Sequence, residues 1–248
     1  MSAYEAFASV YDLFMEQVEY DQWLNHIHAV WDKFGLHPKT VIDLGCGTGS
    51  ILLPLAKEGL DVIGVDLSPE MLAEADHKAM GEGLFLRLAC QDMTELELGE
   101  KVDCILSLCD CMNYLTEDGQ LEDAFQSIAK HMKKESLFLF DMNTEYKFRE
   151  VLGQNVFGSA EEGAAYIWEN DYDEEEKINE YYVSFFIEQE NGLYERVEEY
   201  HYERAYSMEE IENGLQAAGM ELVEVYDGYS FDVPRAESER LLFAARLK

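Results

Sequence analysis

The stretch Val41-Ile-Asp-Leu-Gly-Cys-Gly-Thr-Gly49 determines how the rest of this 248-residue chain is interpreted. It begins within residues 40–44, an apolar run typical of a buried strand, and continues into three glycines spaced two apart. A glycine-rich turn between a strand and a helix lets a ligand approach the backbone closely. We therefore expect a strand over 40–44, a ligand-binding turn after it, and a helix over 50–58.

Apolar strands and helices alternate beyond this turn. The clearest helix spans residues 117–133, and Ser68-Pro69 caps another. Strands that alternate with helices form a parallel sheet covered on both faces. The expected fold is α/β and Rossmann-like, with a mostly parallel seven-stranded sheet and helices on both faces. The six strands expected after the first lie at residues 61–65, 84–89, 102–108, 137–141, 220–227 and 240–247.

Two helices are expected before the sheet. Apolar side chains recur at helical spacing over residues 4–18. A second helix is expected from Asp21, a good N-cap, until Gly35 and Pro38 stop it. We expect this N-terminal segment, residues 1–37, to cover the ligand site.

The pattern changes after Asn143, where a helix over 145–152 gives way to alternating segments rich in Tyr, Glu, Val and Phe. These predict an antiparallel β insertion over residues 154–206, after the fifth strand, within a domain formed by 38–153 and 207–248. The insertion should rise beside the carboxyl edge of the sheet, as a substrate lid, a dimer interface or a solvated sheet face. Its strands are expected over 164–172, 177–190 and 194–206, Asn191-Gly192 as a hairpin turn, and Ser207-Met-Glu-Glu210 as a capping box that opens a helix to Ala218.

The spacing of the glycines distinguishes between two classes of ligand. A dinucleotide enzyme would carry G-x-G-x-x-G to seat a pyrophosphate, whereas this turn is G-x-G-x-G with an acid, Asp43, two residues before Gly45. S-adenosylmethionine (AdoMet) has no phosphate, carries a positive sulfonium and presents an amino group. A carboxylate suits that cation and would repel a pyrophosphate, so we predict AdoMet and disfavour NAD(P).

Two further acids follow the next strands. Asp66 lies 21 residues beyond Gly45, near the distance at which an acid binds ribose hydroxyls. Asp92 follows the third strand, where a carboxylate could accept a hydrogen bond from an adenine amino group. A single acid at a strand end is usually only a helix N-cap. Three acids after successive strands beside a triple-glycine turn favour a binding site.

The runs VIDLGCGTGS, GVDLSPEML, LACQDM and VDCILSLCDCMNYL resemble the four cofactor motifs of class I AdoMet-dependent methyltransferases over residues 38–143. YEAFASVYDLFM and LFDMNTEYKF are similar to small bacterial YqeM-like methyltransferases. The resemblance implies that Gly45, Cys46, Gly47 and Asp43 hold the methionine part. It also implies that Asp66 holds the ribose, that Leu67, Met71, Asp92 and Met93 surround the adenine, that Leu108 and Asp110 lie near the methyl group, and that Tyr11 and Trp23 close over the methionine end.

Methyl transfer needs a nucleophile in line with the S–CH₃ bond, an amine arriving deprotonated and a hydroxyl needing a base. We take Asp110, Asn113 and Tyr11 as candidate catalytic residues, with Tyr114 and Asn143 as alternatives. His131 and His201 could act as bases but are more often structural. For Tyr11 and Trp23, aromatic core packing is an equal alternative.

The charge and the cysteine content limit which acceptors, partners and metals are expected. A net charge of −34, from 52 acids and 18 bases, repels nucleic acid and anionic membranes. We expect a small-molecule acceptor, with an RNA methyltransferase, a non-catalytic AdoMet-binding partner protein and a homodimer as alternatives. The sequence has neither a signal peptide nor a membrane span, which predicts a cytoplasmic protein. Five cysteines without a second metal-ligand pair favour reduced thiols and no metal site.

Overall fold

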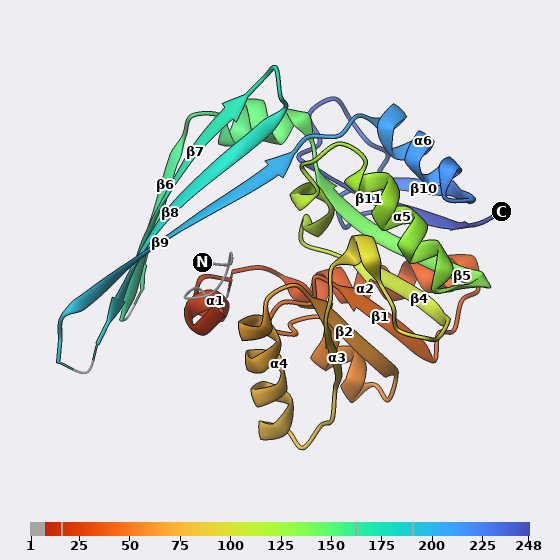
Figure 1. The fold of residues 1–248 in the computed structure, drawn as a ribbon, viewed down its shortest axis with the longest axis horizontal. Helices are drawn as coiled ribbons and strands as arrows, with labels where there is room; N and C mark the ends of the chain where they lie inside the picture. The colour runs from red at the N-terminus through yellow and green to blue at the C-terminus, as the bar shows by residue number, and fades with distance from the viewer. Residues whose placement is uncertain (1–7, 16, 162, 190) are drawn as a thin grey trace.

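The computed structural model describes residues 8–248 except 16, 162 and 190, with the side chains of 8–10 also left out. Its larger sheet has seven strands, six running parallel and one against them (Figure 1). In spatial order the strands are β3 (Arg87–Cys90), β2 (Asp61–Asp66), β1 (Thr40–Leu44), β4 (Val102–Ser107), β5 (Met132–Asn143), β11 (Arg240–Leu247) and β10 (Met220–Asp227). The predicted fold class is confirmed, and so is the antiparallel pairing of β10 with β11.

The order of the strands reverses between β1 and β4, which both pair in parallel with each other and with strands on opposite sides. In open α/β sheets, ligands bind beyond the carboxyl ends of the strands at such a switch point. Asp43 and Leu106 are register partners there, so the turns after β1 and β4 leave the sheet side by side. The glycine-rich stretch follows β1 at this position.

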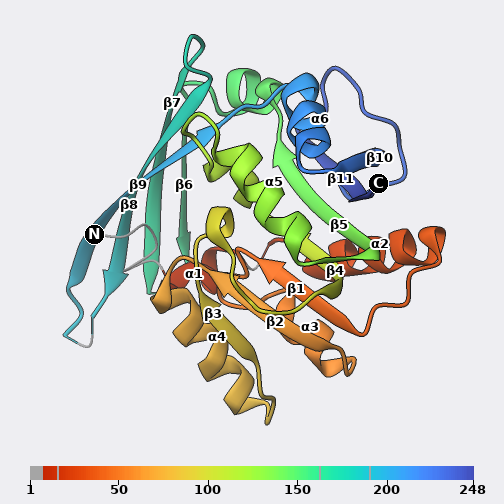
Figure 2. The same cartoon turned by 45° about the vertical axis from the view of Figure 1, so that its right-hand side comes forward.

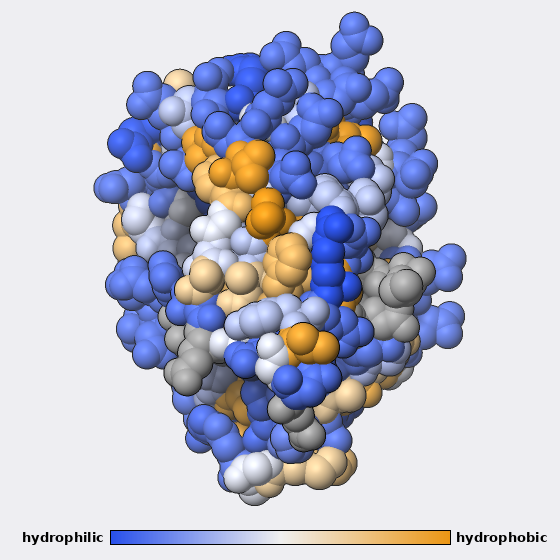
Figure 3. Space-filling model, turned by 90° about the vertical axis from the view of Figure 1, so that its left-hand side faces the viewer, coloured by the Kyte–Doolittle hydropathy of each residue, from blue (hydrophilic) through white to orange (hydrophobic). Residues whose placement is uncertain are grey.

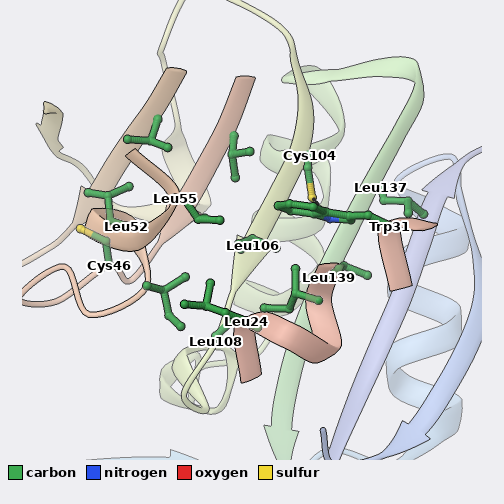
Figure 4. Close-up of a cluster of buried hydrophobic side chains, with 14 of the residues drawn as sticks. Leu24, Trp31, Cys46, Leu52, Leu55, Cys104, Leu106, Leu108, Leu137 and Leu139 are labelled. Atoms are coloured by element: carbon green, nitrogen blue, oxygen red, sulfur yellow. Dashed lines mark hydrogen bonds between the residues drawn. The ribbon is translucent and has the colours of Figure 1, made fainter. Parts of the chain in front are cut away.

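Helices cover both faces of the sheet because each contributes one apolar side. On one face α2 (Tyr20–Phe34), α3 (Leu52–Lys57) and α4 (Pro69–Gly81) pack into one buried cluster. Figure 4 shows its centre, where the Trp31 indole donates a hydrogen bond to Cys104 Sγ at 3.3 Å. On the other face α5 (Gln120–Lys130) and α6 (Met208–Ala217) bury a second cluster that includes Phe125, Phe138 and Phe140.

The second sheet is antiparallel, in the order β6 (Val156–Glu161), β7 (Ala164–Asp173), β8 (Ile178–Glu188) and β9 (Tyr194–Arg204). It stands beside the larger sheet, with α1 (Ala8–Phe14) between it and α4 (Figures 1 and 2). Three of its strands match the expected segments. The sequence analysis missed β6, because its residues carry no sustained alternation of apolar and polar side chains.

Several element ends differ from the predictions. Asp21 is not an N-cap: α2 begins at Tyr20, and no side chain caps it. The helix expected over 145–152 is a π-helix, η3 (Lys147–Leu152). Ser68 caps α4 and Ser207 forms the predicted capping box with Glu210. The expected helix over 4–18 is represented by α1 and a turn at Met15, and residues 4–7 and 16 lie outside the described part.

Across the described residues, every helix is too short or too polar to span a lipid bilayer.

Candidate active site

The glycine-rich turn is held against the neighbouring strand by its own backbone. The Gly45 and Cys46 amides both donate to the Val65 carbonyl, at 2.8 and 3.0 Å. Gly45 has a φ of +71°, and a Cβ there would lie 2.3 Å from Cys111 Sγ. Any side chain at Gly45 would therefore be strained and would also displace the loop after β4. The turn and that loop are packed as closely as the backbone permits.

A pocket of about 360 Å³, the water at its mouth included, opens where the turn after β1 meets the loop after β4. It brings together residues that the sequence analysis selected from three separate segments. Its lining consists of Tyr11, Tyr20, Trp23, Asp43, Gly45, Cys46, Gly47, Thr48, Ser50, Ile51, Leu108 and Cys109.

Asp43 is the one acid in this lining. Its side chain is 3% exposed, and its Oδ2 has no hydrogen-bond partner among the residues that the structure describes. Burial, and next the negative charge of Asp66, raise its pKa to about 7. A buried carboxylate oxygen without a partner is costly to a fold, so its presence here points to a cationic ligand group that satisfies it.

Aromatic residues from the N-terminal helices form the opposite wall. The Tyr20 hydroxyl is hydrogen-bonded to the side chains of Tyr11 and Ser50, and Tyr11 also bonds the Cys109 side chain. Trp23 stacks on Tyr229 with ring centroids 4.2 Å apart. The two N-terminal helices thus close the pocket with groups that offer both apolar surface and hydroxyls.

One acid attaches α1 to the glycine-rich turn. Asp12 accepts a hydrogen bond from the Thr48 hydroxyl at 2.6 Å and pairs with Lys78 of α4, also at 2.6 Å. Phe14 of the same helix contacts the rings of Tyr166 and Phe185 in the second sheet. Helix α1 is therefore held between the glycine-rich turn and the second sheet.

The predicted ribose and adenine residues do not line this pocket. Asp66 accepts the Gly47 amide at 2.8 Å and the Ser68 amide at 2.9 Å, so it holds the turn in shape. Asp92 is the N-cap of a short 3-10 helix, η1 (Met93–Glu95), and Leu67 is 69% exposed. Met71 does not fit its expected place beside an adenine, because its side chain is 2% exposed and packs inside the fold.

The loop after β4 has an unusual backbone and an ionic network beneath it. Cys109 and Asp110 both have positive φ, at +63° and +55°. The Asp110 carboxylate pairs with Arg240 at 2.6 Å, and Arg240 also pairs with Asp141 at 2.6 Å. Burial would raise the pKa of Asp110, but the charges of Arg240 and Lys147 outweigh it and keep the pKa low.

A second carboxyl, from the other sheet, completes this network. Glu203 of β9 is 1% exposed and is hydrogen-bonded to Asp110. The side-chain amide of Asn143 donates to both carboxyls, to Glu203 at 3.1 Å and to Asp110 at 3.0 Å. Burial, and then the charge of Asp110, raise the pKa of Glu203 well above its usual value. The two carboxyls thus have pKa values shifted in opposite directions, upward for Glu203 and downward for Asp110.

Two of the candidate catalytic residues are occupied by such contacts. Asp110 is absent from the pocket lining and is engaged by Arg240, Asn143 and Glu203. Asn113 is fully buried. Its side chain donates to the backbone carbonyls of Asn143 and Arg204 and accepts a hydrogen bond from the backbone amide of Asn143. These contacts make both residues positioning groups that hold the β4 loop against the second sheet. Tyr11 alone of the three lines the pocket.

Sequence reasoning missed Arg240, Tyr229 and Glu203. No local pattern marks them, because each acts through a partner about 90 or more residues away, and only the strand order brings β11 and β9 to the β4 loop. The described residues contain no group of His, Cys, Asp and Glu side chains arranged to hold a metal ion.

Comparison with known proteins gives a consistent result. Residues 41–135 match the methyltransferase domain family. The chain is 36% identical to the putative methyltransferase YqeM of Bacillus subtilis and 34% identical to a putative methyltransferase of Geobacillus sp.. These matches cover 98% of this chain and 96% and 99% of the two relatives. An S-adenosylmethionine-dependent methyltransferase from Clostridium acetobutylicum superposes with a TM-score of 0.89 at 34% identity, over 98% of both chains.

The fold, the pocket at its switch point and these matches define an AdoMet-dependent methyltransferase. Within that class, the chain belongs to the family of putative methyltransferases that includes YqeM.

The residues present fit AdoMet. When bound, it supplies a methyl group on a positively charged sulfur that is already a good electrophile. Asp43 Oδ2, which is unpaired among the described residues, suits the amino group of this molecule, and Gly47 leaves open space beside the backbone. The contribution of the chain is to bind, to orient and to exclude water, which is the main source of rate when the electrophile is already activated.

Proposed function

We propose that this enzyme methylates a small molecule that is neutral or cationic, by direct in-line transfer to N, O or C. The observation that carries the proposal is the charge beside the site. Residues 161–210, which form most of the second sheet, contain seventeen acids and three bases. Such a wall raises the local concentration of cations and repels polyanions, and a nucleic-acid enzyme usually has a basic stripe there.

The cofactor roles follow from the same geometry, as proposals. Asp43 binds the AdoMet amino group, and Gly45, Cys46 and Gly47 line its methionine part. Asp66 holds the ribose while keeping its bonds to the turn. In the same proposal Leu67, Asp92 and Met93 border the adenine, Leu108 lies near the methyl group, and Tyr11 and Trp23 cover the methionine end.

We also propose that the insertion, residues 154–206, is a lid over the acceptor. Its support is the position of α1, whose Tyr11 lines the pocket while its Phe14 packs on Tyr166 and Phe185. The segment 1–37 and the insertion then enclose the acceptor together. The remaining segments, 38–153 and 207–248, form the AdoMet-binding domain in this proposal.

The test uses labelled AdoMet with two fractions of a cell extract, bulk RNA and metabolites below about 1 kDa. We expect label in the metabolite fraction only, because the acidic wall excludes the RNA at low salt. Label in RNA alone would replace this proposal by an RNA methyltransferase. Label in neither fraction, with AdoMet still bound in calorimetry, would favour a non-catalytic AdoMet-binding partner protein.

A homodimer is supported by the opposite face of the second sheet. Every second side chain of each strand lies on this face. Among them are Val156, Ile167 and Tyr200, which are 62%, 44% and 52% exposed. Figure 3 looks onto this side of the molecule, where apolar side chains gather among charged ones. Exposed apolar and aromatic residues together are typical of protein interfaces. We propose that two copies meet through this face.

The dimer predicts that Ile167→Glu shifts the protein to monomer in sedimentation analysis, because it places charges against an apolar contact. Phe85→Glu is the matched control, since Phe85 is 92% exposed outside the second sheet and its replacement should leave the mass unchanged. A monomeric parent protein at tens of micromolar would contradict the proposal.

A further inference from the structure

Asp141 is a fully buried carboxylate to which the proposed function assigns no role. It lies near the carboxyl end of β5, the strand between β4 and β11 (Figure 1). Its Oδ1 accepts a hydrogen bond from the backbone amide of Asp110 at 2.7 Å. Its Oδ2 accepts hydrogen bonds from the Tyr229 hydroxyl and the Arg240 guanidinium, both at 2.6 Å. The two oxygens of one side chain thus receive donors from three separate segments of the chain.

The first donor belongs to the loop after β4, which lines the pocket at the glycine-rich turn through Leu108 and Cys109. Cys109 and Asp110 both have a left-handed backbone, which residues other than glycine keep only when their surroundings hold them in it. The hydrogen bond from the Asp110 amide to Asp141 holds the chain at this point. Asp141 therefore helps to determine how Leu108 and Cys109 face the pocket.

The other two donors belong to the aromatic wall of the same pocket. Trp23 lines the pocket, and its ring stacks on the Tyr229 ring with centroids 4.2 Å apart and an interplanar angle of 7°. The Arg240 guanidinium lies 5.6 Å from the centroid of a Trp23 ring. Because Tyr229 and Arg240 both donate to Asp141 Oδ2, the two partners of the indole share one anchor.

We propose that Asp141 is a positioning residue that fixes these two walls relative to each other before AdoMet binds. The inference rests on the proposed function, in which Trp23 covers the methionine end of AdoMet and Leu108 lies near its methyl group. Walls that are already in place reduce the ordering that binding requires, and in-line transfer needs a fixed geometry. Asparagine cannot take over this role, because its side chain has one acceptor oxygen and its NH₂ group would face a donor.

The first test compares Asp141→Asn with the parent protein by AdoMet calorimetry. We expect the AdoMet dissociation constant to rise about tenfold, because a wall that is no longer fixed must be ordered when AdoMet binds. Near-UV circular dichroism of the ligand-free variant should lose the part of the signal that Trp23→Leu also removes, because the stack of Trp23 on Tyr229 loosens. An unchanged dissociation constant or an unchanged spectrum would overturn the proposal.

Tyr229→Phe provides a second test that leaves every buried charge in place. It keeps the ring under Trp23 and removes only the hydroxyl, so AdoMet should bind about threefold more weakly. If Tyr229 acts through Asp141, the double variant should bind AdoMet no more weakly than Asp141→Asn alone. A further threefold loss in the double variant would show that the two residues act independently, which would contradict the shared anchor.

Asp103→Asn is the matched control, because Asp103 is also a strand carboxylate with several donors. It accepts the backbone amides of Lys39 and Thr40 at 2.9 and 3.0 Å and pairs with Lys133 at 2.6 Å. It lies near the amino end of β4, at the edge of the sheet away from the pocket. Its replacement should lower the free energy of unfolding and leave the AdoMet dissociation constant within about twofold. Equal losses of AdoMet affinity in Asp103→Asn and Asp141→Asn would reduce Asp141 to a general role in stability.

Trp23→Leu separates this inference from the proposed function. If Trp23 covers AdoMet, the variant should bind AdoMet about tenfold more weakly or worse in calorimetry. Weak binding in Trp23→Leu with normal binding in Asp141→Asn would overturn the role of Asp141 and leave the proposed cofactor site intact. Normal binding in Trp23→Leu would show that the proposed cofactor site is wrong, and the inference would fail with it.

Discussion

Replacing Asp43 by asparagine is expected to stabilise the ligand-free protein and to remove most of its affinity for AdoMet. The carboxylate is buried, and one of its oxygens has no partner within the described residues. Asparagine keeps the shape and removes the charge. The variant should bind AdoMet about 100-fold more weakly, roughly 3 kcal/mol, because a charge-assisted contact to the amino group is lost.

The stability gain has a defined pH window. The pKa of Asp43 is about 7 in the folded chain and near 3.8 when unfolded, so the folded state binds the extra proton between these values. The contribution of Asp43 to the free energy of unfolding is therefore complete below about pH 4 and is lost as the pH rises through about 7. A shift of about 3 units corresponds to about 4 kcal/mol, the upper limit of what Asp43→Asn recovers at pH 8.

Urea unfolding at pH 5 and pH 8 and AdoMet calorimetry at pH 6 and pH 8 measure both effects. The parent should bind AdoMet about tenfold more weakly at pH 6, where Asp43 is mostly protonated, while Asp43→Asn shows no such change. Asp66→Asn is the matched control, since both oxygens of Asp66 accept backbone amides and its replacement should not stabilise. A variant no more stable than the parent at pH 8 would contradict this view of Asp43.

Replacing Arg240 by methionine should destabilise the protein by about 3–5 kcal/mol at pH 7.5. The guanidinium is the shared partner of Asp110 and Asp141, and Asp141 is fully buried. Removing one side of a buried ion pair leaves charges that the interior cannot solvate. The Arg240 guanidinium also lies 5.6 Å from the ring centroid of Trp23, so AdoMet binding should weaken as well.

Two comparisons make this result specific. Arg246→Met on the same strand removes an exposed pair with Glu221 and should change stability by less than about 1 kcal/mol. Adding Asp110→Asn and Asp141→Asn to Arg240→Met should restore much of the loss, because no unpaired charge then remains. The measurement is the free energy of unfolding in denaturant of four proteins: the parent, Arg240→Met, Arg246→Met and the triple variant. Equal losses for Arg240→Met and Arg246→Met would show that the buried network contributes nothing special.

The local pattern of the sequence was enough to predict the larger sheet and the glycine-rich turn. Short apolar runs, helix caps such as Ser68 and the capping box at Ser207 are local features, and the structure confirms them. The AdoMet class followed from glycine spacing and Asp43, because these determine how closely a ligand approaches and which charge it carries. Two local predictions were wrong, the Asp21 cap and the missing strand β6, since neither has a strong local signature.

The tertiary structure decided which polar residues are free to act. Asp110, Asn113 and Asp66 look equally available along the chain, yet each is engaged by partners that only the fold brings near. Conversely, Glu199 and His201 form a buried pair on the inner face of β9, which only the packing of the second sheet makes a buried surface. The sequence thus determined the fold class and the cofactor through local backbone and charge requirements. The assignment of positioning groups came from contacts between residues distant in the chain, which no local pattern encodes.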